Sequence, residues 1–268
     1  MRVAVVGHVE WVDFLHVERS PKTGEIIQAT ETWQVAAGGG ADAAVQLRKL
    51  AGSATLYTAL GDDPRGRKAF DELHARGVRV EAAWREEPQR RAVCFLDAAG
   101  ERTIALLGPK LVPREADALP WEELEHVDGV YFTGGDPGAV RLARRANVLV
   151  ATARELPVLR EASVRLDVLL GSTADPEERY DGGLEPAPRY VVRTEGARGG
   201  TVDPGGRFPP GKVPGPVVDA YGAGDAFAAG LTYGMASGVP IERALELASR
   251  CGAAVLAGRG PYEGQLTL

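Results

Sequence analysis

Short apolar runs alternate with helix-forming segments along almost the whole of this 268-residue chain. The runs are residues 3–6, 55–60, 127–132, 148–151, 164–170 and 190–194. A continuous apolar run bounded by glycine or polar turns is typical of a strand that is buried on both faces. Strands that alternate with helices predict an α/β fold, with a mostly parallel central sheet flanked by helices on both faces. Folds of this kind bind ligands at the carboxyl ends of their strands.

The composition limits the partners that we expect for the chain. Its net charge is −6, with acidic and basic residues interleaved, and no basic patch favours nucleic-acid binding. No apolar run is long enough to span a membrane, and residues 1–7 lack the pattern of a signal peptide. Cys94 and Cys251 do not make a disulfide framework. We therefore expect a single cytoplasmic domain over residues 1–268, with neither nucleic acid nor membrane among its partners.

Residues 218–230 lead from a short apolar segment, through a turn that contains glycines, into a helix of small residues. Gly222 and Gly224 let the backbone turn tightly and approach a ligand closely. The free N–H groups and the positive dipole end at the start of that helix suit a phosphate or a developing oxyanion. Asp225 would repel a phosphate, but it would serve as a general base for a hydroxyl that attacks one. The stretch indicates transfer of a phosphoryl group to an alcohol.

Glycine followed by aspartate can also be only a loop and a helix cap, but the order of residues is more specific here. Residues 219–225 read Asp-Ala-Tyr-Gly-Ala-Gly-Asp. They resemble the Asp-Thr-x-Gly-Ala-Gly-Asp signature of the ribokinase (PfkB) family of carbohydrate kinases, with Ala220 in place of threonine. The resemblance implies a ribokinase-like fold with a small β lid, in which Asp225 is the catalytic base. It also implies an anion hole formed by Gly222, Ala223 and Gly224.

A second stretch with several glycines, residues 36–45, ends the expected lid and opens a helix. It resembles the family's first signature, a Gly-Gly pair followed by Asn-x-Ala, and implies that Gly38, Gly39 and Asp42 contact the sugar. Ala37 stands where the first glycine is usual, and Asp42 replaces the asparagine. Because an amide donates and accepts whereas a carboxylate only accepts, we expect Asp42 to face hydroxyl donors. The alternative is a tight turn with Asp42 as a helix cap.

Two excursions from the α/β pattern, residues 10–36 and 88–107, resemble the halves of the family's β lid. The family places a sugar-binding aspartate just past the first strand, and Asp13 occupies that place; the alternative is a solvated lid residue. Arg90 and Arg91 could reach an anionic group, although such arginines are more often solvated. Both excursions carry more apolar surface than two short hairpins can bury alone. Lids of this family often pair across a two-fold axis, so we expect a homodimer through the lids.

The resemblance also implies an ATP site built from segments that follow later strands. Family members order the phosphates and a magnesium-bound water with Asn-x-x-Glu, where this chain has Ser172 and Asp175. A Thr-x-Gly-x-x-Gly segment lines the triphosphate and ribose, and the helix after the signature closes the adenine pocket. The matching residues here are Thr194, Gly196, Gly199, Ser249 and Cys251. The alternative for Ser172 is a helix cap before Pro176.

Two cations are expected besides ATP. Mg²⁺ would bridge the phosphates, with Asp175 holding one of its waters. In several family members a monovalent cation such as potassium sits behind the anion hole, held by the first aspartate of the signature and by nearby carbonyls. Asp219 and the carbonyl of Tyr221 match two of those positions. Asp219 could equally be a structural cap.

Taken together, these features predict an ATP-dependent phosphotransferase that acts on a hydroxyl of a sugar or sugar-like polyol. One alternative is a nucleoside or inositol kinase of the same family, in which aromatic lid residues bind a base. Those residues are Trp11, Phe14 and Trp33. Another is a sugar-binding relative without turnover. The residues that depart from the family pattern suggest it, namely Asp42, Ala151, Ala153, Ser172 and Asp175.

Overall fold

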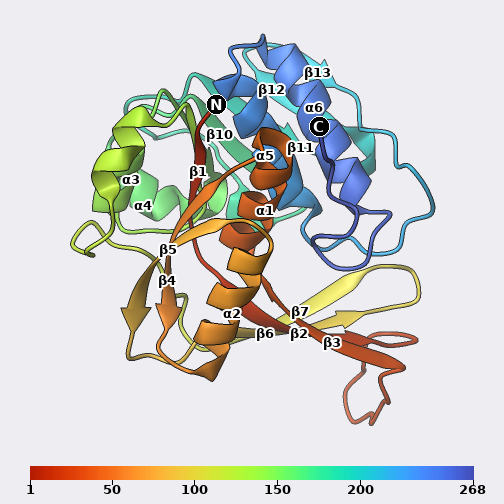
Figure 1. The fold of residues 1–268 in the computed structure, drawn as a ribbon. Coiled ribbons are helices and arrows are strands. Elements are labelled where there is room, and N and C mark those ends of the chain that lie inside the picture. Colours follow the sequence, from red (N-terminus) through yellow and green to blue (C-terminus); the bar gives the residue numbers. More distant parts are fainter.

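The computed structural model describes all 268 residues, and its largest element is a nine-stranded sheet (Figure 1). Its strands are β1 (Val3–Val6), β4 (Thr55–Gly61), β5 (Arg79–Arg85), β8 (Gly129–Phe132), β9 (Val148–Thr152), β10 (Val168–Ser172), β11 (Tyr190–Thr194), β12 (Gly200–Asp203) and β13 (Gly206–Phe208). Their order is β13-β12-β11-β10-β9-β8-β1-β4-β5. All neighbours from β5 to β11 pair in parallel, and β12 and β13 add an antiparallel edge. The predicted α/β class is confirmed.

Helices cover both faces of this sheet. One face carries α1 (Gly39–Ala51), α2 (Pro64–Ala75), α5 (Ala223–Ala236) and α6 (Ile241–Val255). The other carries α3 (Pro137–Ala143) and α4 (Leu156–Ala162). Four short 3₁₀ helices complete the elements: η1 (Trp121–His126), η2 (Ala153–Glu155), η3 (Pro176–Glu178) and η4 (Gly196–Arg198). Both faces of the sheet are therefore withdrawn from water.

The strand β1 shows why the central strands are apolar at every position. Val3 and Val5 belong to the core under α1 and α5, whereas Ala4 and Val6 belong to the core under α3 and α4. Successive strand residues point to opposite faces, and here each face meets a layer of helices. β1 is therefore apolar at every position rather than alternating.

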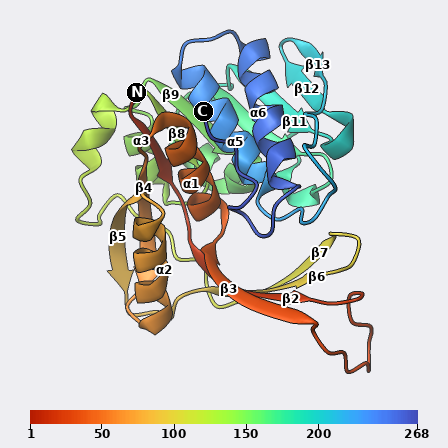
Figure 2. The ribbon, with the colours of Figure 1, turned by 45° about the vertical axis from the view of Figure 1, so that its right-hand side comes forward.

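A second sheet of four strands projects from the main body as a lid (Figure 2). Its strands are β2 (Glu10–His16), β3 (Glu31–Ala37), β6 (Arg91–Leu96) and β7 (Arg102–Leu107), in the order β3-β2-β6-β7. The central pair, β2 and β6, is parallel, and the two outer pairs are antiparallel. The lid is thus assembled from two segments that lie far apart in the sequence.

Two central strands begin later than the apolar pattern predicted. β8 starts at Gly129 and β10 at Val168, because each is preceded by an aspartate that is already engaged. Asp128 accepts a hydrogen bond from the backbone N–H of Arg2, and Asp167 accepts one from the N–H of Leu149. These hydrogen bonds fix the residue that precedes each strand, so the regular strand pairing begins after it.

Candidate active site

The turn at Gly222 begins α5 and forms the centre of the site. Gly222 has φ 78° and ψ −1°, a left-handed conformation that costs a residue with a side chain about 1–2 kcal/mol. An ideal Cβ on it would lie 3.0 Å from Cβ of Pro261. Asp225 follows in the first turn of α5, which begins at Ala223. The backbone N–H groups at a helix start have no intrahelical partners, so those of α5 are available to an anion near Asp225.

The start of α1 lies beside the start of α5. An ideal Cβ on Gly39 would lie 2.7 Å from Oγ1 of Thr133, 3.1 Å from Oδ1 of Asp225 and 3.4 Å from Cε1 of His8. Three polar side chains therefore converge on a glycine that leaves no room for a larger residue. The two glycine segments singled out in the sequence meet here, and Thr133 and His8 join them without having been predicted.

Asp225 lies in surroundings that suit a base. Burial raises the pKa of Asp225 to about 6, and the carboxylates of Glu178 and Glu10 add to the rise. The positive charges of Arg102 and Arg154 oppose it. A carboxyl with this pKa is largely ionised at neutral pH and accepts a proton more readily than an ordinary aspartate.

Asp42 is fully buried beneath the same turn. Neither of its carboxyl oxygens has a hydrogen-bond partner, and Oδ2 is 3.4 Å from the ideal Cβ position of Gly222. Burial, with the nearby charges of Asp225 and Glu10, raises the pKa of Asp42 well above its usual value. A raised pKa favours the protonated carboxyl, which can donate as well as accept, unlike the acceptor that the sequence suggested. It does not cap α1, which has no side-chain cap.

The lid strand β2 separates Glu10 from Asp13. Glu10, Val12 and Phe14 share one face of β2 and are buried toward the cleft. Asp13 points the other way: its carboxylate accepts a hydrogen bond from Gln34 at 2.5 Å and pairs with Arg91 at 2.9 Å. The structure therefore places Glu10, whose Cγ is 3.2 Å from the ideal Cβ of Gly38, where the sequence suggested Asp13. Alternation along the strand was the signal that could have found it.

Basic side chains gather around His8 and Glu10. Nζ of Lys110 donates to the carbonyl of Thr133 at 3.1 Å, and Nδ1 of His8 lies 3.2 Å from the same oxygen. Nε of Arg90 is 3.2 Å from Oε1 of Glu10. Burial and the charge of Lys110 lower the pKa of His8 well below its usual value, so the imidazole is neutral. Lys110 and His8 were absent from the sequence prediction because no local pattern links them.

The expected phosphate segment lies at the end of β10. Asp175 and Glu178 both pair with Arg154, the latter at 3.3 Å, and Glu178 accepts the N–H of Ser172 at 2.8 Å. Asp175, rather than Ser172, caps the following turn, because it accepts the N–H of Glu177. Burial raises the pKa of Glu178, which is close enough to act on Asp225. Glu178 and Arg154 are thus additional site residues that the sequence did not reveal.

A cavity of about 230 Å³ adjoins this segment. Its lining includes Gly171, Ser172, Asp175, Glu178 and Arg193. It lies at the carboxyl ends of β10 and β11, which is where ligands of open α/β sheets bind. The predicted Ser172 and Asp175 therefore border a real opening.

The remaining residues predicted to hold the nucleotide lie at the end of β11, in or next to η4, and in α6. Thr194, at the end of β11, donates its hydroxyl to the carbonyl of Gly171, and Gly199 has φ 80° with no room for a side chain. Ser249 donates to the carbonyl of Pro209. Cys251 instead faces α5, where its Sγ is 2.8 Å from the ideal Cβ of Gly230. Gly196, in η4, has open space around it.

Asp219, the first aspartate of the signature, is fully buried behind the turn. Its Oδ1 accepts the N–H of Tyr221 at 2.8 Å, and its Oδ2 accepts the N–H of Gly260 at 2.9 Å. Both oxygens are thus engaged by backbone donors. No three or more histidine, cysteine, aspartate or glutamate side chains are grouped as a metal-binding cluster anywhere in the structure.

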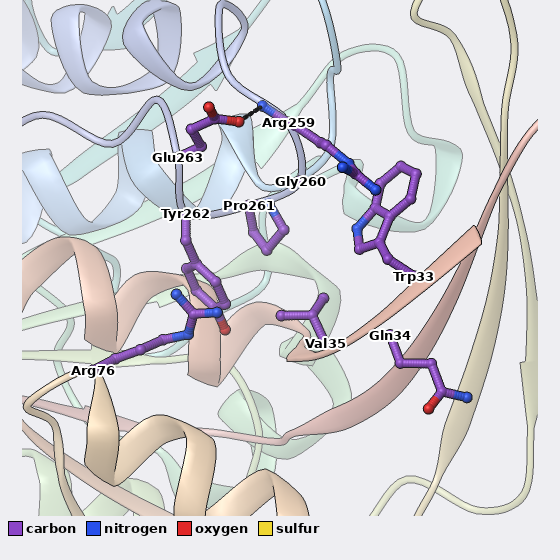
Figure 3. A pocket seen from close by; sticks show the side chains of 9 residues that line it. All are labelled: Trp33, Gln34, Val35, Arg76, Arg259, Gly260, Pro261, Tyr262 and Glu263. Atoms are coloured by element: carbon purple, nitrogen blue, oxygen red, sulfur yellow. Dashed lines mark hydrogen bonds between the residues drawn. The ribbon is translucent and has the colours of Figure 1, made fainter. Parts of the chain in front are cut away.

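A surface pocket of about 280 Å³ is lined by residues of β3 and of segment 259–263, together with Arg76 (Figure 3). Arg259 lies 3.9 Å from the ring centroid of Trp33, and Arg76 lies 4.1 Å from that of Tyr262. Both arginines are already paired, with Glu31 and Glu72. The pocket therefore lies between the lid strand β3 and the C-terminal segment, and none of the catalytic groups lines it.

Comparison with known proteins identifies the family. A sequence profile described as pfkB family carbohydrate kinase matches residues 1–162 and 137–267. The chain belongs to the pfkB family of carbohydrate kinases. A carbohydrate kinase needs a base next to an anion-binding site, and Asp225 lies next to the turn at Gly222.

None of the helices combines the length and the apolar composition that a membrane crossing requires.

Relatives of this pfkB-family chain match over nearly its whole length. The ATP-dependent ribose-1-phosphate kinase of Halopiger xanaduensis is 32% identical over 97% of this chain and 93% of its own. The ribokinase of Bacillus subtilis is 25% identical over 99% and 96%, respectively. The structure of Arabidopsis thaliana ribokinase complexed with ribose and ATP has a TM-score of 0.77 at 21% identity, covering 98% of this chain and 95% of that one. This last likeness shows that the fold is ribokinase-like.

Proposed function

We propose that this carbohydrate kinase transfers the γ-phosphoryl group of ATP to a hydroxyl of a sugar, with Asp225 as the base. The observation that carries the proposal is the position of the Asp225 carboxyl, at the start of α5 and beside Gly39. A base and an anion-binding turn then face one space, as in-line transfer to an alcohol requires. The profile match and the relatives, kinases of ribose and ribose 1-phosphate by name, support the same reaction.

In the proposed reaction, the hydroxyl oxygen of the sugar attacks the γ-phosphorus while its proton passes to Asp225. The bond from the γ-phosphorus to the bridging oxygen breaks, and ADP leaves with that electron pair. The N–H groups of Ala223 and Gly224 stabilise the charge on the transferred group. Gly38, Gly39 and Glu10 border the acceptor, and Asp225, whose pKa is about 6, takes its proton as the transfer proceeds.

The nucleotide would lie along the ends of β10 and β11, beside Ser172 and Thr194. Mg²⁺ is bound in such enzymes mostly through phosphate oxygens and waters, with few protein ligands. Asp175 and Glu178 follow Ser172 in the chain, and both line the cavity. Their carboxylates could supply the few protein ligands that the ion requires. Bound there, the ion would neutralise charge on the phosphates. The adenine would lie near Ser249, which donates to the carbonyl of Pro209, and near Cys251, which packs α6 on α5 at Gly230.

A monovalent cation is the finer part of the proposal. Potassium would have to contact Asp219 and the carbonyl of Tyr221, but both Asp219 oxygens already accept backbone N–H groups. This arrangement favours the structural-cap alternative for Asp219. Equal rates in sodium and potassium buffers would support the cap, and a several-fold rate increase in potassium would support the ion.

The proposal also covers location and assembly. The cytoplasm is the expected compartment, because ATP is available there and neither cysteine forms a disulfide. A homodimer through the lid is expected because β7 exposes Ile104, Leu106 and Leu107, at 40%, 53% and 41% of their surface. Such a contact would also cover an unpaired strand edge.

The test of the proposed function is a coupled ADP-release assay with Mg-ATP. The acceptors are ribose, ribose 1-phosphate, a hexose, inositol and a nucleoside, each over a range of concentrations. ADP release that depends on a sugar, and that is lost in Asp225→Asn, supports the proposal. Release only with inositol or the nucleoside would move the chain to the alternative kinase. Calorimetric binding of a sugar with no ADP from any acceptor would show a binding protein without turnover.

A further inference from the structure

Trp33, in the lid strand β3, is in contact with an aromatic ring and with a guanidinium. Its ring stacks on that of Phe14, which lies directly opposite it on β2, with the centroids 4.9 Å apart and the planes at 6°. The guanidinium of Arg259 lies 3.9 Å from the centroid of the Trp33 ring, and Figure 3 shows the two side chains together. Stacked rings and a cation over an aromatic face attract each other in a defined geometry. Trp33 therefore links the lid sheet to the segment after α6.

From Phe14 the contacts continue into the catalytic turn, residues 219–224. The fully buried ring of Phe14 meets the ring of Tyr221 edge-on, with the centroids 4.9 Å apart and the planes at 70°. The backbone N–H of Tyr221 donates to Oδ1 of Asp219 at 2.8 Å. Tyr221 directly precedes Gly222, where α5 is about to begin. Because packed interiors transmit strain, a shift of the Phe14 ring would reach the N–H groups at the start of that helix.

From Arg259 the contacts lead back to the same carboxylate. Gly260 follows Arg259 directly in the chain, and its N–H donates to Oδ2 of Asp219 at 2.9 Å. The N–H of Arg259 itself donates to the Glu263 carboxylate at 2.8 Å, which fixes the conformation of this short segment. The contacts thus form a closed circuit of six residues: Trp33, Phe14, Tyr221, Asp219, Gly260 and Arg259. A shift of the lid relative to the catalytic turn has to break or bend at least one of these contacts.

We infer that Trp33 is a positioning residue, which docks the lid on this circuit and thereby sets the N–H groups of the catalytic turn for phosphoryl transfer. The inference rests on the proposed function, because it concerns the transfer step at the same site. Trp33 lines the pocket of Figure 3, which none of the catalytic groups lines, so it acts through Phe14 and Arg259. A misplacement of reacting groups by about 1 Å can slow a reaction about 100-fold, so even a small loss of docking should lower turnover.

The chain offers a matched control in Trp84. The guanidinium of Arg67 lies 3.8 Å from its ring centroid, and the ring of Phe70 lies beside it with the centroids 5.8 Å apart. Like Trp33, Trp84 is partly buried and packs against the main core. It belongs to β5, at the edge of the large sheet, and both of its partners belong to α2. Removing either tryptophan deletes contacts of the same kinds, but only the loss of Trp33 opens the circuit.

Steady-state ADP release with the preferred sugar compares Trp33→Ala with Trp84→Ala. We expect Trp33→Ala to lower kcat about 10- to 100-fold with little change in KM for ATP, and Trp84→Ala to keep its kcat. Trp33→Phe retains an aromatic face and should recover most of the lost turnover. A raised KM for the sugar with a normal kcat would make Trp33 a substrate contact, and equal losses in the two alanine variants would make it an ordinary packing residue. Either result would overturn the inference.

Hydrogen exchange tests the circuit independently of activity. Backbone amides exchange through local opening, so peptides that cover residues 219–224 should exchange about tenfold faster in Trp33→Ala and at the normal rate in Trp84→Ala. Thermal melts identify a variant that fails to fold, and Arg259→Gln changes a side chain that is 41% exposed and opens the same circuit more mildly. Unchanged exchange in both Trp33→Ala and Arg259→Gln would overturn the inference. ADP release with no sugar would instead defeat the proposed function, and the exchange rates would still decide whether Trp33 sets the turn.

Discussion

The backbone N–H of Gly260 donates to Oδ2 of Asp219 at 2.9 Å, across the back of the catalytic turn. The other oxygen of Asp219 accepts the N–H of Tyr221 within the turn itself. One buried carboxylate thus ties the segment after α6 to the residue that precedes Gly222. The conformation of the anion-binding turn is held from behind, on the side away from the substrate.

We expect Asp225→Asn to lower turnover about 100-fold or more, because the amide cannot accept the proton of the attacking hydroxyl. KM should change little, since the side chain keeps its size and place. Steady-state ADP release on the preferred sugar measures both. Thermal melts should show a stability equal to or above that of the unmodified protein, because a carboxylate among other carboxylates has been removed. Turnover close to normal would exclude Asp225 as the base.

The pH dependence should report the same carboxyl. Because the pKa of Asp225 is raised to about 6, kcat/KM should be constant above neutrality and fall about tenfold for each pH unit below about 6. The sign follows from the role of a base, which is inactive once protonated. An acid limb near pH 4, where an unperturbed aspartate titrates, would contradict this assignment.

Asp42→Asn tests whether the buried carboxyl carries a proton. The amide supplies one donor group and one acceptor of nearly the same shape, so most activity should remain. The raised pKa of Asp42 makes its ionisation costly in the folded state, so stability should fall as pH rises toward the folded pKa. Melts of the unmodified protein should therefore decline relative to Asp42→Asn as pH rises above about 4, where an unfolded aspartate titrates.

The contrasting result for Asp42 is equally clear. If the carboxylate is needed in its charged form, Asp42→Asn will lose activity at every pH and its melting profile will run parallel to that of the unmodified protein. Asp62→Asn is a suitable control, because Asp62 is an exposed partner of Arg67 outside the cleft. It should leave both the activity and the pH dependence of melting unchanged.

Gly222→Ala should damage the site and not only the fold. The left-handed backbone costs about 1–2 kcal/mol for alanine, and the new Cβ would lie 3.0 Å from Cβ of Pro261. Gly238→Ala shares the strained φ, at 73°, but has open space around it. Both variants should lose stability in urea titrations, whereas only Gly222→Ala should lose turnover. Similar turnover in the two would mean that the turn is not an anion hole.

The lid contact is open to a direct test of assembly. Light scattering at micromolar concentration should give twice the chain mass of 28.4 kDa. The double substitution Leu106→Glu with Leu107→Glu should return the protein to a single chain, since a dimer would bury both side chains. Val239→Glu changes an exposed apolar residue at the other end of the molecule and should not alter the mass. A monomeric unmodified protein would exclude the dimer.

The sequence predicted those parts of the site that depend on local pattern. Gly39 and Asp225 belong to motifs whose backbone geometry demands glycine or a helix start, so their positions followed from the chain alone. The sequence analysis chose Asp13 and not Glu10 as the acid near the sugar. The family motif gave the residue type, but it did not take into account that only every second side chain of a strand points toward the cleft. Lys110 comes from a segment distant in sequence, and only the sheet topology brings it to His8.

The same limit applies at the phosphate segment. Ser172 and Asp175 were found by spacing, but Glu178 is directed inward because Pro176 starts a single 3₁₀ turn and not the helix that the sequence suggested. Turn length depends on tertiary contacts, here the pairing of Arg154 with both acids, and not on propensity. The α/β class with a mostly parallel sheet, by contrast, follows from the apolar runs of the central strands, whereas the order of the nine strands was not predicted.

The bond between Gly260 and Asp219 has a consequence for how the protein is made. Chains fold from the N-terminus as the ribosome releases them, and all strands of both sheets lie before residue 209. Residues 259–268 emerge after them, yet they supply the Gly260 donor and Tyr262, whose hydroxyl bonds the carbonyl of Ala36 at the base of the lid. A chain that stops short of them would carry the sheet and lid without a finished catalytic turn. The catalytic turn is thus completed only after every strand of both sheets has been made.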